Sequence, residues 1–338
     1  MSSPNTRVVV IGTSAGGLDA LRTIVAALPA DFPVPIGIVM HTAPQSPGVL
    51  ASILERAGPL PAICVTGIQR LRPATIYVAP PDCHLIIEPG RIRATKGPKE
   101  NRFRPAIDPL FRSAAQVYGP GTVGVILTGN LDDGAAGLWT IKKLGGVAIV
   151  QDPADALCPS MPASAMRQVA VDHCVPLAEV ASLLVHVVAD PPETGEFVVP
   201  DETKTEIDIA KERHPIDAGL HEISEPSPYA CPECHGVLLR LKGEGPVRFR
   251  CHTGHAYTVE SLMAEVDEKI DEALWNAIRA LEEAVLLWER VAPMVTQSGA
   301  TPSEAETHTT QLEEDSRRYS DAIRRIVRER ARWRAKEK

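Results

Sequence analysis

Aromatic residues are scarce in this chain, and long apolar runs are missing from it. The 338 residues include 5 Phe, 5 Tyr and 4 Trp, a composition that suits a core built from Ala, Val, Ile and Leu. No apolar stretch approaches the ~20 residues that span a bilayer, so we expect no membrane span. The residues before the first apolar run do not form the core of a signal peptide, and we expect a cytoplasmic protein.

The chain also lacks an excess of positive charge. Its formal net charge is −8, which argues against nucleic acid as a partner. The seven cysteines should be reduced or metal-bound in a cytoplasmic protein. The length is sufficient for one sizeable core and a smaller module.

Short runs rich in Val and Ile alternate with helical patterns in the first half of the chain. The expected strands are 8–11, 36–40, 76–79, 123–127 and 147–150, and the expected helices are 18–27, 49–56, 109–118 and 135–144. This alternation predicts an α/β fold, a doubly wound and mostly parallel sheet with helices on both faces. Right-handed crossovers would then place all the strand carboxyl ends at one edge, where sites assemble in such folds.

Changes of composition divide the chain into four parts. The α/β pattern covers residues 1–188. An acidic segment follows at 189–228, predicted to be a linker that is poorly ordered unless it docks through Phe197–Val199, Ile207 and Ile209. Residues 229–258 are rich in Cys and His, and residues 259–338 predict a helical hairpin or coiled coil with a basic tail.

The helical part has an apolar seam with steps of three and four residues. We expect breaks at Pro293 and at 299–302, with mutual packing of the two helices as the simplest role of the seam. The seam could also support oligomerisation, and the basic tail is either solvated or a patch for an acidic partner. The expected seam residues are Ile270, Leu274, Ala277, Leu281, Ala284, Trp288 and Val291, and then Tyr319, Ile323, Ile326 and Trp333.

The Cys/His-rich segment has the spacing of a metal site. Two paired ligand groups, C-x2-C and C-x3-H, predict a tetrahedral and structural zinc site with no open coordination position. His235 and His252 are alternatives for the fourth ligand. The expected ligands are Cys231, Cys234, Cys251 and His255.

Ser14 follows the first expected strand within G-T-S-A-G-G, residues 12–17. A tight turn between strand and helix would expose its hydroxyl beside unpaired backbone N–H groups, as a nucleophile requires. A Rossmann-type phosphate loop is the alternative, and it would make the protein a nucleotide-binding oxidoreductase. Ser14, however, stands where that motif has its second glycine.

Two further strands deliver polar groups to the same edge. His41 ends the second expected strand, and Asp132 and Asp133 follow the run 123–127. Acyl transfer by serine needs a base and a carboxylate that orients it, so the three strand ends predict a Ser-His-Asp site. The chain order Ser, His, Asp differs from the Ser, Asp, His order of α/β-hydrolases.

Motifs spread over residues 6–188 resemble the catalytic domain of CheB-type protein-glutamate methylesterases. They are G-T-S-A-G-G, the strand-end His41, N-R-F-R-P-A-I-D at 101–108 and L-T-G-x-x-x-D-G-A-A-G-L at 127–138. The resemblance implies a serine hydrolase, without a catalytic cofactor, that demethylates glutamate γ-methyl esters on chemoreceptor helices and can deamidate glutamine there. On the matching positions Ser14 is the nucleophile, His41 the general base and Asp133 its orienting carboxylate, while Asp132 is a non-catalytic neighbour.

The chain departs from the family pattern at three positions. Ala15 replaces a hydroxyl residue, Asn130 replaces a methionine of the oxyanion pocket, and Leu131 replaces a glycine, which should exclude positive φ at residue 131. These changes motivate an alternative hypothesis, a catalytically weakened adaptor in a signalling pathway. Arg102 and Arg104 either order the site or meet an acidic receptor surface, unless they only brace the core.

The usual receiver domain is not in this sequence, so we expect no phosphorylation control within the chain. The part after residue 228 is expected to recruit a substrate or signalling partner, or to oligomerise the enzyme. Its C-P-x-C and F-R-C-x-x-G-H-A-Y motifs look like the tail of some stand-alone CheB-like proteins.

Overall fold

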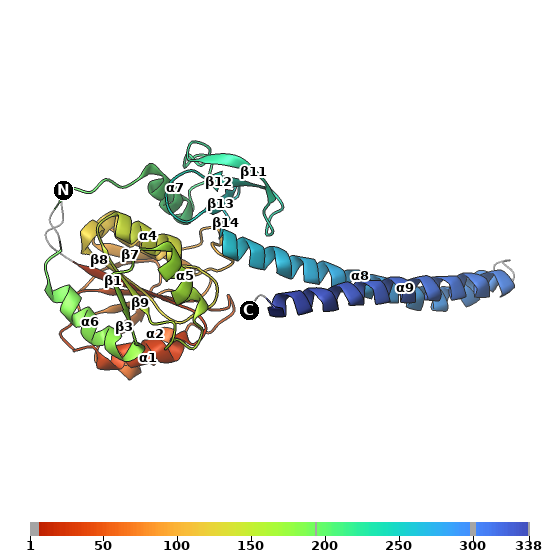
Figure 1. Ribbon diagram of the computed structural model, residues 1–338, viewed down its shortest axis with the longest axis horizontal. Coiled ribbons are helices and arrows are strands. Elements are labelled where there is room, and N and C mark those ends of the chain that lie inside the picture. The colour runs from red at the N-terminus through yellow and green to blue at the C-terminus, as the bar shows by residue number, and fades with distance from the viewer. Residues whose placement is uncertain (1–6, 193–194, 298–301, 337–338) are drawn as a thin grey trace. The chain divides into compact units, whose positions relative to one another are not determined.

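A seven-stranded parallel sheet organises the first part of the computed structural model, which describes residues 7–192, 195–297 and 302–336 (Figure 1). The strand order is β10-β9-β8-β1-β2-β5-β3. The strands are β1 (Val8–Thr13), β2 (Ile36–Met40), β3 (Ala62–Cys64), β5 (Ile76–Val78), β8 (Thr122–Ile126), β9 (Val147–Gln151) and β10 (His173–Val175).

Helices cover both faces of this sheet, as the α/β pattern predicts. Alternate residues of β1 point to opposite faces, with Val9 and Ile11 in one buried cluster and Val8 and Val10 in the other. The first cluster is completed by α1 (Gly17–Ala27), α2 (Leu50–Ala57) and α6 (Leu177–Ala189), which lie together on one side of the sheet in Figure 1. The second includes residues of α3 (Ile107–Tyr118), α4 (Ala135–Lys143) and α5 (Ser160–Gln168). The predicted fold class is confirmed.

A three-stranded antiparallel sheet, absent from the sequence prediction, packs beside α3. Its order is β4-β7-β6, from β4 (Ile68–Arg70), β6 (His84–Glu88) and β7 (Arg91–Thr95). Polar and charged residues interrupt the apolar alternation in these strands, so the strands lack the sequence pattern by which strands are predicted. A single 3-10 turn, Gly119–Gly121, links α3 to β8.

Within the acidic segment 189–228, the helix α7 (Asp201–Ala210) docks on α3 and β6. Ile207 and Ile209 are fully buried, and Phe197 packs against the second core cluster. These are apolar residues of the expected docking strip. Val199 packs against the same cluster, whereas Val198 is 85% exposed, so the docking prediction is wrong for Val198.

A four-stranded antiparallel sheet follows, built from β11 (Ser224–Ala230), β12 (Val237–Leu241), β13 (Arg248–Cys251) and β14 (Ala256–Thr258). Its small core contains Cys231, Leu238, Phe249, Cys251 and Tyr257. We call residues 224–262, this sheet with the first turn of the next helix, the Cys/His module.

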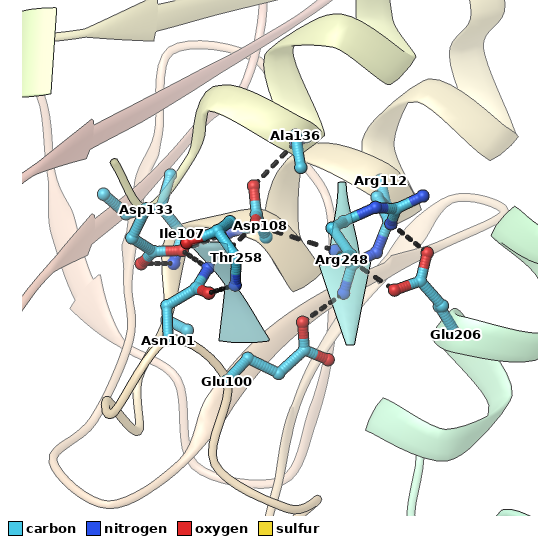
Figure 2. A network of polar contacts seen from close by, with 12 residues as sticks. Glu100, Asn101, Ile107, Asp108, Arg112, Asp133, Ala136, Glu206, Arg248 and Thr258 are labelled. Atoms are coloured by element: carbon cyan, nitrogen blue, oxygen red, sulfur yellow. Dashed lines mark hydrogen bonds and ion pairs between the residues drawn. The ribbon is translucent and has the colours of Figure 1, made fainter. Parts of the chain in front are cut away.

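Buried ion pairs join the Cys/His module to the α/β layer (Figure 2). Arg250 lies 2.9 Å from Glu100 and 3.2 Å from Glu206, while Arg112 pairs with Glu100 and Arg248 with Glu206. Burial alone would raise the pKa of Glu100, but Arg112 and Arg250 outweigh it and lower the pKa to about 2. Both carboxylates are thus ionised, and removing one partner would leave a buried charge uncompensated.

The second compact unit begins at Met263, and its described residues, 263–297 and 302–336, are helical. It contains α9 (Pro302–Lys336) and most of α8 (Val259–Gln297). Arg324 pairs with Glu282 at 2.6 Å and Arg330 with Asp267 at 3.1 Å, so the two helices are antiparallel. The break expected at Pro293 is wrong, because α8 continues to Gln297. Of the break expected at 299–302, residues 299–301 lie outside the described residues.

The apolar seam of this unit differs in part from the expected one. Ile278 is buried and Ala277 is exposed, because the buried face continues from Leu274 in a step of four residues where the prediction took a step of three. Ile270, Ala284, Tyr319 and Ile326 are exposed, which contradicts their predicted seam positions. The side chains of Trp288, Val291 and Trp333 lie outside the described set.

In the part of the chain that the structure describes, no helix is both long enough and apolar enough to cross a bilayer.

Candidate active site

The loops after β1, β2 and β8 meet at the carboxyl edge of the parallel sheet. The Ser14 N–H donates to the Thr128 carbonyl at 3.0 Å, and the His41 N–H donates to the Thr13 carbonyl at 3.2 Å. The ladder of the sheet therefore continues past the strand ends and holds the three loops together. The chain reverses its order in the sheet at β1, which is where α/β folds form their sites.

Ser14, His41 and Asp133 form one chain of hydrogen bonds in this place. Ser14 Oγ lies 3.1 Å from His41 Nδ1, and His41 Nε2 lies 2.7 Å from Asp133 Oδ2. For Nδ1 to accept the serine proton, Nε2 must carry the ring hydrogen and donate it to the carboxylate. In chymotrypsin Nε2 faces the serine and Nδ1 faces the aspartate, so the two ring nitrogens are exchanged here. The nucleophile, the base and the orienting carboxylate are the same three residue types in both.

Phe103 fixes the plane of the His41 ring. The two rings stack with centroids 3.7 Å apart and an interplanar angle of 8°. Phe103 could not be predicted as a site residue, because nothing in the motif at 101–108 indicates which side chain faces the histidine. The stacking restricts ring rotation, so Nδ1 and Nε2 stay aimed at their partners.

Asp133 is a buried carboxylate that receives several donors (Figure 2). Besides His41, the Ile107 N–H donates to Oδ2 at 2.7 Å, and Asn101 Nδ2 donates to Oδ1 at 2.9 Å. Burial alone would raise the pKa of Asp133, but the bond and charge of His41 and the bonds from Ile107 and Asn101 lower it. Asp133 is therefore ionised and able to stabilise a protonated His41.

Gly12 permits the close approach that brings the Ile107 N–H to Asp133. A Cβ on Gly12 would lie 2.3 Å from Ile107 Cγ2, so any larger residue would displace the start of α3. Since α3 begins at Ile107, the positive end of its dipole also points toward the carboxylate. The absence of a side chain at Gly12 in the first strand thus allows the first N–H of α3 to reach Asp133.

The loop after β8 keeps the backbone path of a glycine-containing turn. Leu131 has φ of 63°, so the expectation that leucine would exclude positive φ there is wrong. Its N–H donates to Ser160 Oγ at 3.1 Å, which helps to hold this conformation. A left-handed leucine costs about 1 kcal/mol or more, which the surrounding bonds offset.

Arg104 braces the neighbouring loops. Its Nη2 lies 2.7 Å from Asp82 Oδ1, and its Nη1 donates to the Gly97 carbonyl at 3.0 Å. The bracing alternative therefore fits Arg104. Arg102 follows Asn101 in the same turn, and both have positive φ.

Asp132 points into the Cys/His module. Its Oδ1 accepts a bond of 2.7 Å from Thr258 Oγ. Burial raises the pKa of Asp132 to about 7, with smaller contributions from Glu260 and Asp133, while the Thr258 bond opposes the rise. Two adjacent aspartates thus have opposite environments, and the one with the lowered pKa contacts His41.

The four expected metal ligands of the Cys/His module lie together. Their ligand atoms are all within 4.8 Å of one another, with 3.6 Å between Cys234 Sγ and Cys251 Sγ and 3.5 Å between Cys251 Sγ and His255 Nδ1. A tetrahedron with zinc–sulfur distances of ~2.3 Å has sulfur–sulfur edges of ~3.8 Å, so this set fits zinc. Cys231 completes it, and neither His235 nor His252 belongs to this group among the described residues.

The Asp132→Asn substitution should stabilise the protein only where Asp132 would be ionised. Between pH ~4 and ~7 an unfolded aspartate releases a proton that the folded protein retains, so the wild type loses stability as the pH rises through this window. Asparagine cannot ionise, and its Oδ1 can still accept from Thr258. We expect the free energy of urea unfolding of the variant to exceed that of the wild type by on the order of 2 kcal/mol at pH 8, with no such gain at pH 4. A gain of the same size at both pH values would contradict the raised pKa.

Comparisons with known proteins agree with this geometry. The CheB methylesterase family model matches residues 9–184. A putative protein-glutamate methylesterase/protein-glutamine glutaminase of Leptospira interrogans is 41% identical over 182 residues, which are 54% of this chain and 94% of that protein. Protein-glutamate methylesterase/protein-glutamine glutaminase 2 of Anaeromyxobacter dehalogenans is 39% identical over 177 residues, with 52% of each chain covered, so this chain spans about half of that relative.

A solved structure shares the fold. The crystal structure of the Thermotoga maritima CheB methylesterase catalytic domain is 32% identical, with a TM-score of 0.52, and the match covers 54% of this chain and 98% of that domain. The family model spans more than half of the chain, and the sheet order and strand-end residues described above lie within the matched range. The chain therefore belongs to the CheB methylesterase family.

Proposed function

We propose that this protein is a serine hydrolase that removes methyl groups from glutamate γ-methyl esters of chemoreceptor-type helices. The observation that carries the proposal is the hydrogen-bond chain Ser14–His41–Asp133 at the sheet edge. The names of its relatives support the glutamate methyl ester as substrate and add glutamine as a second one. An intact relay of this kind favours an enzyme over the weakened adaptor.

The chemistry follows from the relay. Ser14 Oγ attacks the ester carbonyl while His41 Nδ1 takes its proton, and the ionised Asp133 stabilises the resulting imidazolium. The proton then passes to the departing methoxide, which leaves as methanol, and a glutamyl-serine ester remains. Water, deprotonated by His41, attacks this ester and releases the free glutamate side chain and Ser14. With glutamine the leaving group is ammonia.

Backbone N–H groups around Ser14 would hold the oxyanion of each tetrahedral intermediate. The Gly17 N–H already donates to the Ser14 carbonyl and the Gly129 N–H to the Cys158 carbonyl. We therefore assign the role to N–H groups of Ala15, Gly16 and Asn130. Gly16 precedes α1 with φ of 78°, which favours glycine and leaves the N–H groups of the turn outside the helical ladder.

We also propose that Cys231, Cys234, Cys251 and His255 bind a structural zinc ion. Four protein ligands would leave no open coordination position, so the ion would stabilise the Cys/His module and take no part in the hydrolysis. Thiolate ligands require reduced cysteines, and the proposal therefore includes a cytoplasmic location.

The proposed domain plan keeps the boundaries that the sequence predicts, at residues 188, 228 and 258. In this plan the last part, residues 259–338, recruits a signalling partner or a second copy of the chain. The exposed Trp275, Leu286 and Leu287 on α8 support such a role, since surface apolar groups favour association.

Methanol release tests the proposed hydrolysis. With a methylated receptor fragment as substrate, Ser14→Ala should release methanol at least about a thousandfold more slowly than the wild type, because the acyl-enzyme cannot form. Asp133→Asn should also be severely impaired, whereas the neighbouring Asp132→Asn should retain most of the rate. Equal release by wild type and Ser14→Ala would refute the serine mechanism.

Elemental analysis tests the zinc site. Protein purified without chelators should contain about one zinc per chain, and Cys234→Ser should contain much less, because it loses one of four ligands. Cys174→Ser is the matched control, since Cys174 is exposed and lies outside the cluster. A wild type with well under one zinc per chain would contradict the proposal.

A further inference from the structure

The side-chain amide of Asn101 links the carboxylate of Asp133 to the Cys/His module. Its Nδ2 donates to Asp133 Oδ1 at 2.9 Å and to Asp108 Oδ2 at 3.0 Å. Its Oδ1 accepts from the Thr258 N–H at 3.0 Å and from Ser261 Oγ at 3.0 Å. All five residues are buried, and Figure 2 shows Asn101 between Asp133 and Thr258.

The partners of the amide fix its orientation. A backbone N–H can only donate, so the Thr258 N–H must face the amide oxygen, and Nδ2 must then face the carboxylates. Turning the amide over would place its oxygen against both Asp108 and Asp133 and its NH2 group against a donor. The Thr258 N–H therefore determines which end of Asn101 meets Asp133, and the Ser261 hydroxyl donates a second bond to the same amide oxygen.

The backbone around Asn101 is fixed by the same module. The Asn101 N–H donates to the Ala256 carbonyl at 2.8 Å, and Glu100 and Phe103 exchange backbone hydrogen bonds across the turn. Glu100 is further held by its ion pair with Arg250 of β13. This one turn thus presents Asn101 to Asp133 and Phe103 to the ring of His41.

We propose that Asn101 is a positioning residue of the hydrolytic site, oriented by Thr258 and Ser261, and that the Cys/His module supports the catalytic acid through it. The proposal rests on the assignment of Asp133 as the acid of a serine hydrolase. It assigns a task to a part of the chain that lies beyond the match to the family model, which ends at residue 184.

The charges around Asp133 determine how the loss of Asn101 would be observed. His41 faces the carboxylate at 2.7 Å, and the charges of Asp108, Asp132 and His84 interact with it at longer range. A donor to the ionised form lowers the pH at which the His41–Asp133 pair takes up a proton. Removal of the donor should move this proton uptake to higher pH. The acid limb, the part of the pH–rate profile in which the rate falls as the pH is lowered, should move with it.

The test measures the rate at which a fluorophosphonate probe phosphonylates Ser14, with release of fluoride, as a function of pH in the full-length protein. We expect Asn101→Leu to react roughly tenfold more slowly at pH 7 and its acid limb to lie about one pH unit higher. Ser261→Ala keeps Asn101 but removes one donor to its oxygen. Ser261→Ala should move the acid limb in the same direction by a smaller amount. If Asn101→Leu fails to fold, this variant tests the proposal by itself.

Ser227→Ala is the matched control, because Ser227 lies in β11 and donates to the Leu238 carbonyl, away from Asn101. Its acid limb should stay where the wild type has it, whatever its melting temperature. Acid limbs of Asn101→Leu and Ser261→Ala that coincide with that of the wild type would overturn the positioning role alone. A folded wild type that the probe does not label would overturn the proposed function and this inference with it.

Discussion

A carboxylate buried at the edge of a parallel sheet is the constraint on which the site depends. Asp133 is 1% exposed and ionised, so its desolvation must be offset by donors from several directions. Those donors are a side chain after β2, the first N–H of α3 and an amide in the turn before α3. Each requires a particular backbone path, including the close contact of Ile107 with Gly12. The need to satisfy one charge therefore fixes the relative placement of four segments.

The sequence was sufficient to predict the parallel sheet and the three strand-end residues. The buried strands are short runs rich in Val and Ile, which predict a parallel sheet. Because parallel strands bring their carboxyl ends to one edge, Ser14, His41 and Asp133 could be placed together from the sequence alone. The four cysteine and histidine ligands could be predicted for a similar reason, since their spacing is local. The catalytic and metal-binding roles of these residues remain predictions.

The supporting contacts could not be predicted. Asn101 and Thr258 are 157 positions apart, and the Ile107 donor is a backbone group that any residue could supply. The helix α7 could not be predicted, because its buried residue Glu206 is charged. The charge of Glu206 is compensated by arginines distant in the chain. Leu131 shows the opposite case, in which tertiary contacts impose a backbone angle that its own side chain disfavours.

In the proposed arrangement the Cys/His module is part of the catalytic unit. Arg250 of β13 fixes Glu100, residues of β14 and the first turn of α8 orient Asn101, and Thr258 also holds Asp132. A metal ion that tightens the module would therefore also stiffen the acid side of the site, at a distance from the reacting atoms. Support from a second layer of this kind is how a site retains its geometry while its substrate-facing loops vary.

The most direct test of the central claim is to map the residue that a fluorophosphonate probe modifies. Peptide mass spectrometry of the folded, full-length protein should find the label on Ser14, with little or no label in His41→Ala, whose serine has no base. Label on another residue, or equal labelling of wild type and His41→Ala, would contradict the account.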